Sequence, residues 1–94
     1  MNKVAIYPGT FDPITFGHID VIKKGLRLFD KIVVAVSDVE NKNYLFNSTE
    51  RIEIVRKALF SDLKLNKKKI TIISFSSLTT DLCKKYKSNI ILRG

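Results

Sequence analysis

Apolar residues occur along the chain either in short runs or at helical spacing, and the two patterns alternate. The run at residues 31–37 is apolar and rich in β-branched side chains, which is typical of a strand covered on both faces in a parallel sheet. Pro8-Gly9 ends an earlier apolar run, because both residues favour turns. The predicted strands comprise residues 3–7, 31–37, 70–75 and 89–92.

Between these runs, the spacing of apolar residues predicts amphipathic helices. The first helix is expected to open at His18 and to end near the start of the second strand. Ser76-Ser77 can cap the third helix, which is predicted over residues 78–86. The apolar positions of the first helix are Val21, Ile22, Leu26 and Phe29.

The second helix has the clearest start signal. Asn-Ser-Thr-Glu at residues 47–50 resembles a capping box, in which the first and last side chains satisfy free backbone donors of the first turn. The helix is expected to continue to about Phe60, with Ile52, Val55 and Leu59 on its buried side. The predicted order is therefore βαβαβαβ. Such alternation with short connections predicts an α/β fold, a Rossmann-like parallel sheet with helices on both faces.

The length of 94 residues predicts a single domain over residues 1–94, since such a chain buries one core. The longest apolar runs have four or five residues, whereas a membrane span needs roughly 20. The N-terminus shows no export signal, so we expect a cytoplasmic protein. Cys83 is the only cysteine, which excludes an internal disulfide, and its helix position predicts a buried structural thiol. No Cys or His cluster suggests structural zinc.

The net charge of +8 is concentrated near the C-terminus, where residues 64–94 carry 8 Lys and Arg against Asp81 alone. Such a surface attracts polyanions, so a small basic module that binds nucleic acid is one alternative. Aromatic residues do not interleave with these lysines, and no recognised binding motif occurs, which argues against nucleic acid as a partner. A genome biased toward A/T-rich codons, which encode Lys, Ile and Asn, would place the same excess of lysine on solvated faces and is the stronger explanation of the charge.

Candidate chemistry is concentrated between the first strand and the first helix, where residues 7–18 read Y-P-G-T-F-D-P-I-T-F-G-H. The segment has neither the Gly-Lys-Ser/Thr ending of a Walker loop nor G-x-G-x-x-G spacing. It offers two glycines for close backbone approach, the hydroxyls of Thr10 and Thr15, and His18 in the first turn of a helix. A helix N-terminus binds phosphate, and a histidine there can donate a hydrogen bond to charge on a phosphoryl group. The segment predicts a phosphate site.

The residues T-F-G-H at 15–18 have the form T/H-x-G-H, and with G-T-F-D-P at 9–13 they resemble the nucleotidyltransferase superfamily. The longer run Y-P-G-T-F-D-P-I-T-F-G-H-I-D-V-I is similar to the bacterial phosphopantetheine adenylyltransferase family. The resemblance covers all 94 residues in register. Its further matching positions are Phe29-Asp30, Lys42, Phe46, Thr49-Glu50-Arg51, Phe75-Ser76, Leu78 and Leu92-Arg93-Gly94.

The resemblance implies adenylyl transfer from ATP to 4'-phosphopantetheine, which gives dephospho-coenzyme A and pyrophosphate in coenzyme A synthesis, usually with Mg²⁺. By this likeness, His18 contacts the ATP phosphates and stabilises the transition state at the α-phosphorus. Thr10 orients the attacking phosphate, and Thr10 and Phe11 also meet ATP, partly through backbone groups. Family members are commonly hexamers, which implies a homo-oligomer.

Further positions receive roles from the same resemblance. Lys42, on the loop after the second strand, provides a point charge for substrate phosphate, and Arg93 suits a bidentate phosphate contact. Thr79 contacts the pantetheine arm through its backbone, and Gly94 begins a segment that binds ATP. No residue is assigned to a metal, because Asp12 before a proline is expected to fix a turn. The other aspartates considered, which show no ligand spacing, are Asp20, Asp30 and Asp38.

The last predicted strand ends at Arg93-Gly94, where open parallel sheets place ligands. Family members continue well beyond this point, so we expect the chain to be the N-terminal part of a longer domain. One alternative stays open within the superfamily: a nucleotidyltransferase with another phosphate acceptor, such as nicotinamide mononucleotide or glycerol phosphate. The long first motif and Lys42 favour phosphopantetheine.

Overall fold

The computed structural model describes residues 3–76 and 79–93. Strands and helices alternate along these residues as the hydrophobic pattern predicts, and a π-helical turn, η1, directly continues the second helix. The Ser77 and Leu78 part of the predicted third helix lies outside the described residues. The elements are β1 (Val4–Gly9), α1 (Phe16–Leu28), β2 (Lys31–Ser37), α2 (Ser48–Arg56), η1 (Lys57–Asp62), β3 (Ile70–Phe75), α3 (Thr79–Lys85) and β4 (Ile90–Ile91).

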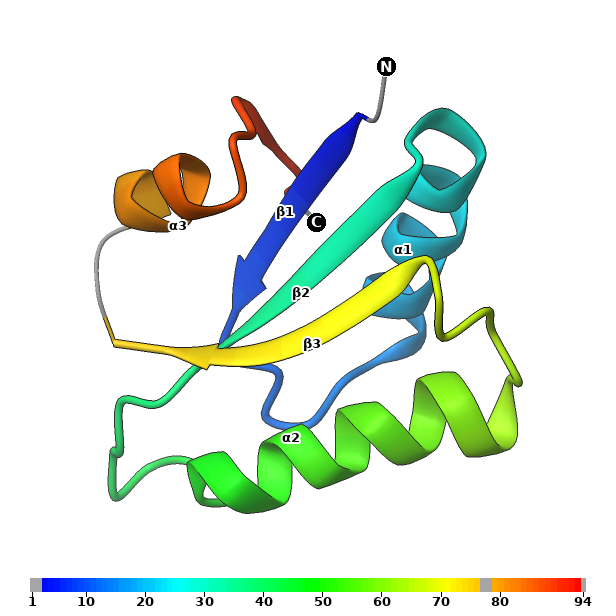
Figure 1. Ribbon diagram of the computed structural model, residues 1–94. Helices are drawn as coiled ribbons and strands as arrows, with labels where there is room; N and C mark the ends of the chain where they lie inside the picture. The colour runs from blue at the N-terminus through cyan, green and yellow to red at the C-terminus, as the bar shows by residue number, and fades with distance from the viewer. Residues whose placement is uncertain (1–2, 77–78, 94) are drawn as a thin grey trace.

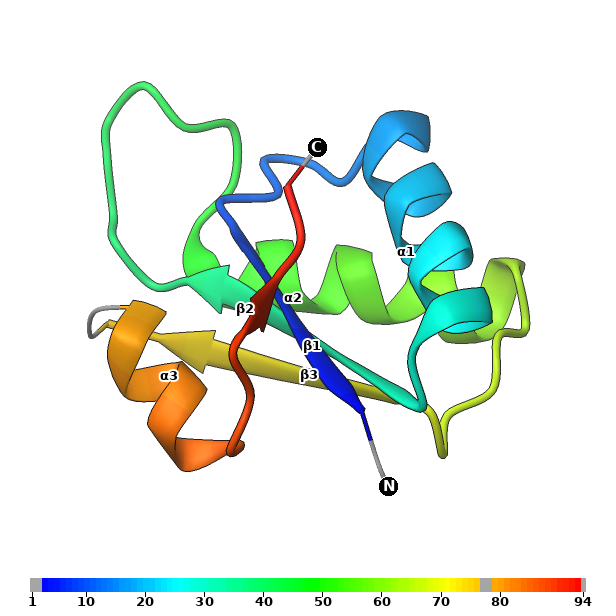
Figure 2. The ribbon, with the colours of Figure 1, turned by 90° about the horizontal axis from the view of Figure 1, so that it is seen from above.

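The strands form one parallel sheet in the order β3-β2-β1-β4. Helices α1 and α2 cover one face of the sheet, and α3 covers the other (Figures 1 and 2). This arrangement confirms the predicted Rossmann-like α/β fold with helices on both faces. The winding direction reverses between β1 and β4, and in open α/β sheets such a switch point is where ligands bind.

The core is divided between the two faces of β2. Ile32, Val34 and Val36 pack with α1 and α2, whereas Val33 and Ala35 pack toward α3. All five side chains are fully buried. This alternation explains why the whole run is apolar, because a central strand with helices on both faces has no solvent-exposed side. Cys83 of α3 packs against the core on this second face of the sheet but is only partly buried. The prediction of a buried thiol is therefore confirmed only in part.

Several element ends differ from the prediction. β1 does not stop at Tyr7 but continues through Pro8-Gly9, which pair with Ala35 and Val36 of β2. β4 pairs with β1 only as far as Ile6, so Pro8 lies on an open edge, where a missing N–H is tolerated.

The start of the first helix is also corrected. α1 begins at Phe16 and not at His18, because Thr15 caps it and the flexible Gly17 is accommodated within its first turn. The second helix continues through η1 to Asp62, beyond the predicted end at Phe60. Within the described residues, 3–76 and 79–93, no helix has the length and apolar character required to cross a membrane.

Candidate functional site

Two clefts open at the carboxyl end of β1, beside the switch point of the sheet. One lies toward α1 and has a volume of about 360 Å³, and the other lies toward β4 and the start of α3, with about 370 Å³. We call them the His18 cleft and the Arg93 cleft. The His18 cleft is lined by Tyr7, Pro8, Gly9, Phe11, Thr15, Gly17, His18 and Val21. The Arg93 cleft is lined by Tyr7, Pro8, Thr79, Ile91, Leu92 and Arg93.

The imidazole of His18 is fixed by the cap of its own helix. The Thr15 backbone N–H donates to His18 Nδ1 at 2.9 Å, and the His18 backbone N–H donates to Thr15 Oγ1 at 3.3 Å. The Thr15 hydroxyl also lies 3.1 Å from Nδ1. Because Nδ1 accepts a backbone hydrogen bond, we assign the single proton of the neutral ring to Nε2. His18 therefore offers one N–H donor whose direction is set by the backbone.

Aromatic packing restrains the same ring. The Phe11 ring centroid lies 4.8 Å from that of His18, and the Tyr7 centroid lies 6.2 Å from it. Phe11 is 2% exposed although its φ is 53°, a backbone conformation that is unfavourable for a phenylalanine. A Cβ at Gly9 would lie 3.0 Å from the Phe11 ring and would force that ring to shift, so glycine allows this close approach. The packing of Phe11 against His18 thus depends on an unfavourable backbone conformation at Phe11 and on the absence of a side chain at Gly9.

Partial burial lowers the pKa of His18 below its ordinary value of 6.5, because the charged imidazolium is less well solvated there. Protonation at Nδ1 would also remove the acceptor of the Thr15 N–H. In the unfolded chain the ring binds its proton at higher pH than in the folded chain. The contribution of neutral His18 to the free energy of unfolding is therefore complete above pH 6.5 and decreases as the pH falls from 6.5 toward the folded pKa.

His18 is the only histidine, so its ¹⁵N and ¹H ring signals report this titration directly. We expect an NMR titration to give a pKa below 6.5 and ring ¹⁵N shifts of the Nε2–H tautomer. Thr15→Val, which removes the hydroxyl but keeps the backbone donor, should leave the tautomer unchanged. A pKa above 6.5, or a ring protonated mainly at Nδ1, would contradict the assignment.

The structure brings some of the predicted site residues together and leaves others apart. His18 and Phe11 share one cleft, and Thr79 and Arg93 share the other. Thr10 is half-buried on the loop after β1, and Lys42 is exposed on the loop after β2; neither belongs to the described lining of either cleft. Gly94 lies outside the described residues.

Tyr7 was not predicted from the sequence to be a site residue. Tyr7 is 3% exposed and, with Pro8, forms a wall of both clefts. Its buried hydroxyl has no hydrogen-bond partner among the described residues, and desolvation raises the pKa of the phenol. The signal that could have identified it is its position, since Tyr7 immediately precedes the Pro-Gly end of the strand, where ligands of such sheets bind.

The described residues offer no preformed metal cage. Within residues 3–76 and 79–93, no three His, Cys, Asp or Glu side chains come together as ligands. Asp12 lies in a turn with Pro13, as predicted, and its carboxylate also accepts hydrogen bonds from the backbone N–H groups of Leu45 and Phe46. A larger cavity of about 620 Å³ lies between residues 13–16 and the α2–η1 helix, but its lining is mainly apolar. The polar donors therefore favour the two smaller clefts as the functional site.

Solved structures of nucleotidyltransferases share this fold. The nicotinic acid mononucleotide adenylyltransferase of Plasmodium falciparum complexed with NaAD is 29% identical, with a TM-score of 0.74 over 93% of this chain and 46% of its own. The bifunctional NMN adenylyltransferase/ADP ribose pyrophosphatase of Francisella tularensis, complexed with AMP and a Mn ion, also gives 0.74, over 95% of this chain and 30% of its own. At 17% identity, the second likeness shows the fold alone.

Curated relatives confirm the resemblance seen in the sequence. The chain is 76% identical over all 94 residues to the phosphopantetheine adenylyltransferase of Pelagibacter ubique, and 49% identical to that of Buchnera aphidicola from Schizaphis graminum. It spans 57% and 54% of the lengths of these two relatives, little more than half. The profile of the cytidylyltransferase-like family matches residues 6–94. The chain therefore belongs to the cytidylyltransferase-like family.

Proposed function

We propose that this chain contributes the catalytic centre for adenylyl transfer from ATP to 4'-phosphopantetheine, which yields dephospho-coenzyme A and pyrophosphate in the cytoplasm. The observation that carries the proposal is the Nε2–H donor of His18, held by Thr15 at the start of α1 and beside a cleft at the switch point of the sheet. The 76% identity to a phosphopantetheine adenylyltransferase supports the choice of acceptor.

In this reaction, a phosphate oxygen of phosphopantetheine attacks the α-phosphorus of ATP. A new P–O bond forms to the α-phosphorus, the bond from it to the β-bridging oxygen breaks, and pyrophosphate leaves with that electron pair. The protein's contribution is positioning and stabilisation of negative charge. The neutral His18 ring donates its Nε2–H to a phosphate oxygen on which charge grows, while the free N–H groups of the α1 N-terminus favour the same anion.

The remaining residues suit the binding of the acceptor. Thr79 and Arg93 lie at the Arg93 cleft, where the guanidinium can hold a phosphate through two hydrogen bonds. Thr10 follows β1 directly and can orient the attacking phosphate. Lys42 supplies a mobile positive charge from the neighbouring loop.

Mg²⁺ is part of the proposal as a companion of ATP. Since the described residues form no cluster of three ligands, the protein would hold the ion mainly through the substrate phosphates, as is usual for Mg²⁺. The ion would neutralise phosphate charge there.

The homo-hexamer implied by the family is also proposed, and sedimentation velocity of the purified chain tests it.

The function is tested by pyrophosphate release with Mg-ATP and 4'-phosphopantetheine, alongside nicotinamide mononucleotide and glycerol phosphate as alternative acceptors. Release that requires phosphopantetheine and is lost in His18→Ala is the expected result. Release with another acceptor would support a sister nucleotidyltransferase. If a folded sample shows no release with any acceptor and no binding of phosphopantetheine, the proposal is wrong; nucleic-acid binding that ignores ATP would favour the basic-module alternative.

Lys42→Ala is expected to weaken phosphopantetheine binding by about tenfold, because one charge-assisted contact to phosphate is lost. The binding of ATP should change little. Isothermal titration with each substrate separates the two effects. Lys23→Ala, an exposed lysine on α1, is the matched control and should bind both substrates as the unmodified chain does. An unchanged affinity of Lys42→Ala for phosphopantetheine would remove Lys42 from the acceptor site.

A further inference from the structure

The loop that carries Lys42 is closed by its own backbone. In this Lys42 loop, residues 38–47, the Tyr44 N–H donates to the Asn41 carbonyl oxygen at 2.9 Å. The Asn43 N–H donates to Asn41 Oδ1, also at 2.9 Å. Lys42 therefore lies in a small turn of the loop. Two apolar side chains of the loop contribute little to its placement, since Val39 is 55% and Leu45 73% exposed.

Asp12 fastens one side of the Lys42 loop to the loop between β1 and α1. Its Oδ2 accepts the N–H of Leu45 at 2.6 Å, and its Oδ1 accepts the N–H of Phe46 at 2.9 Å. Both hydrogen bonds involve a carboxylate and are therefore among the stronger kind. Asp12 directly follows Phe11, whose ring packs against His18. A single carboxylate thus joins the segment that carries Lys42 to the segment that positions His18.

Arg51 of α2 fastens the other side of the loop. Its side chain is fully buried, Nη2 donates to the Val39 carbonyl oxygen at 3.0 Å, and the guanidinium lies 4.9 Å from the centroid of the Tyr44 ring. Glu40 is 3.8 Å from the same Nη2 and accepts the Ser48 N–H at 2.8 Å. That Ser48 hydrogen bond lowers the pKa of Glu40. Polar contacts from both sides therefore determine where the loop lies.

We propose that Asp12 is a positioning residue for the transfer reaction, which sets the location of Lys42 relative to His18, with Arg51 as its counterpart on α2. The inference rests on the proposed function, because it is the acceptor phosphate that Lys42 would meet. Without the Asp12 carboxylate, two backbone donors lose their acceptor and an exposed loop loses its attachment to the catalytic segment. Lys42 would then remain charged but would no longer be held in place.

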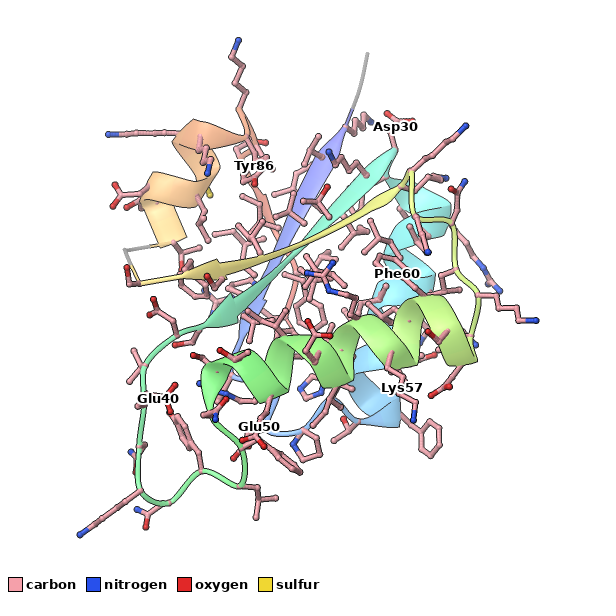
Figure 3. All side chains as sticks on the ribbon, turned by 60° about the horizontal axis from the view of Figure 1, so that its bottom comes forward. Asp30, Glu40, Glu50, Lys57, Phe60 and Tyr86 are labelled. Carbon is pink, nitrogen blue, oxygen red and sulfur yellow. The ribbon has the colours of Figure 1, made fainter. Side chains whose placement is uncertain are left out.

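Asp12→Asn tests this role, because the amide keeps the size of the side chain but turns one acceptor into a donor that faces a backbone N–H. We expect phosphopantetheine affinity to fall by about tenfold, as for loss of the Lys42 contact itself, while ATP affinity stays within about twofold. Hydrogen exchange at the amides of Leu45 and Phe46 should accelerate. The control is Asp30→Asn. Asp30 also accepts a backbone N–H, that of Lys3 at 2.6 Å, but it lies at the opposite end of the sheet from Glu40 of the Lys42 loop (Figure 3).

A double-mutant cycle with Lys42→Ala decides whether Asp12 acts through Lys42. If it does, the double variant binds phosphopantetheine no more weakly than Lys42→Ala alone. Additive losses, or normal binding by Asp12→Asn when Lys42→Ala is impaired, would overturn the inference and leave the proposed function standing. If Asp12→Asn does not fold, Arg51→Lys takes its place in the cycle with the same expectations. If the unmodified chain binds no phosphopantetheine, the proposed function fails and the positioning role fails with it.

Discussion

His18→Ala is expected to lower kcat by a factor on the order of 10²–10³, the cost of removing one preorganised donor to developing charge. The Nε2–H is directed by the Thr15 backbone and by packing on Phe11, so no reorganisation is needed as negative charge grows. The affinity for ATP should fall far less, because the donor gains most of its strength in the transition state. Single-turnover rates together with equilibrium binding of ATP measure the two effects separately.

His18→Gln is the matched variant, since its side-chain amide can still present an N–H donor from a similar distance. Part of the lost rate should return in this variant. Thermal unfolding of both variants shows how much the imidazole's half of the α1 capping box contributes to stability, since Nδ1 accepts the Thr15 N–H. Equal losses of rate and of ATP affinity in His18→Ala would mean that the residue binds the ground state and has no special role in the transition state.

Phe11→Ala is expected to lower the free energy of unfolding by about 3 kcal/mol, because a buried aromatic ring is replaced by a cavity between Tyr7 and His18. Phe16→Ala is the natural control, since Phe16 is 89% exposed and should change stability by less than about 0.5 kcal/mol. Urea unfolding of the two variants under identical conditions makes the comparison.

The backbone at Phe11 allows a sharper test. Phe11→Gly removes the same ring but suits the φ of 53°, so it should be less destabilising than Phe11→Ala by about 1 kcal/mol. If alanine and glycine destabilise equally, the left-handed conformation carries no energetic cost. A stability of Phe11→Ala close to that of Phe16→Ala would instead show that the ring is not part of the folded core.

Local sequence signals were sufficient for the elements whose causes are local. The β-branched run of β2 and the capping box at Asn47 are both found where predicted, and in each case the decisive interactions lie within a few residues. The predicted end of β1 was wrong because Pro-Gly is normally a turn signal. Here Pro8 can belong to the strand because β4 is short and leaves Pro8 on an open edge of the sheet. The predicted start of α1 at His18 was wrong because Thr15 caps the helix, so that Phe16 and Gly17 already belong to its first turn.

The site could be predicted only where its residues belong to one motif. His18 and Phe11 were found because the motif brings them together over a few residues. Asp12 accepts hydrogen bonds from backbone groups 33 and 34 residues away, and no local sequence pattern indicates such a partner. Arg51 was missed because the buried side of α2 was expected to be aliphatic, whereas this arginine is fully buried and contacts Val39 and Tyr44 of the Lys42 loop.

The wall shared by the two clefts has a thermodynamic consequence. Tyr7 and Pro8 face both the cleft that holds His18 and the cleft that holds Arg93. A ligand that shifts the Tyr7 ring from one side changes the free energy of occupying the other side. By linkage, that effect must be reciprocal and equal in size. If the two clefts hold the nucleotide and the acceptor, as proposed, this coupling between the two substrates would arise at the end of β1.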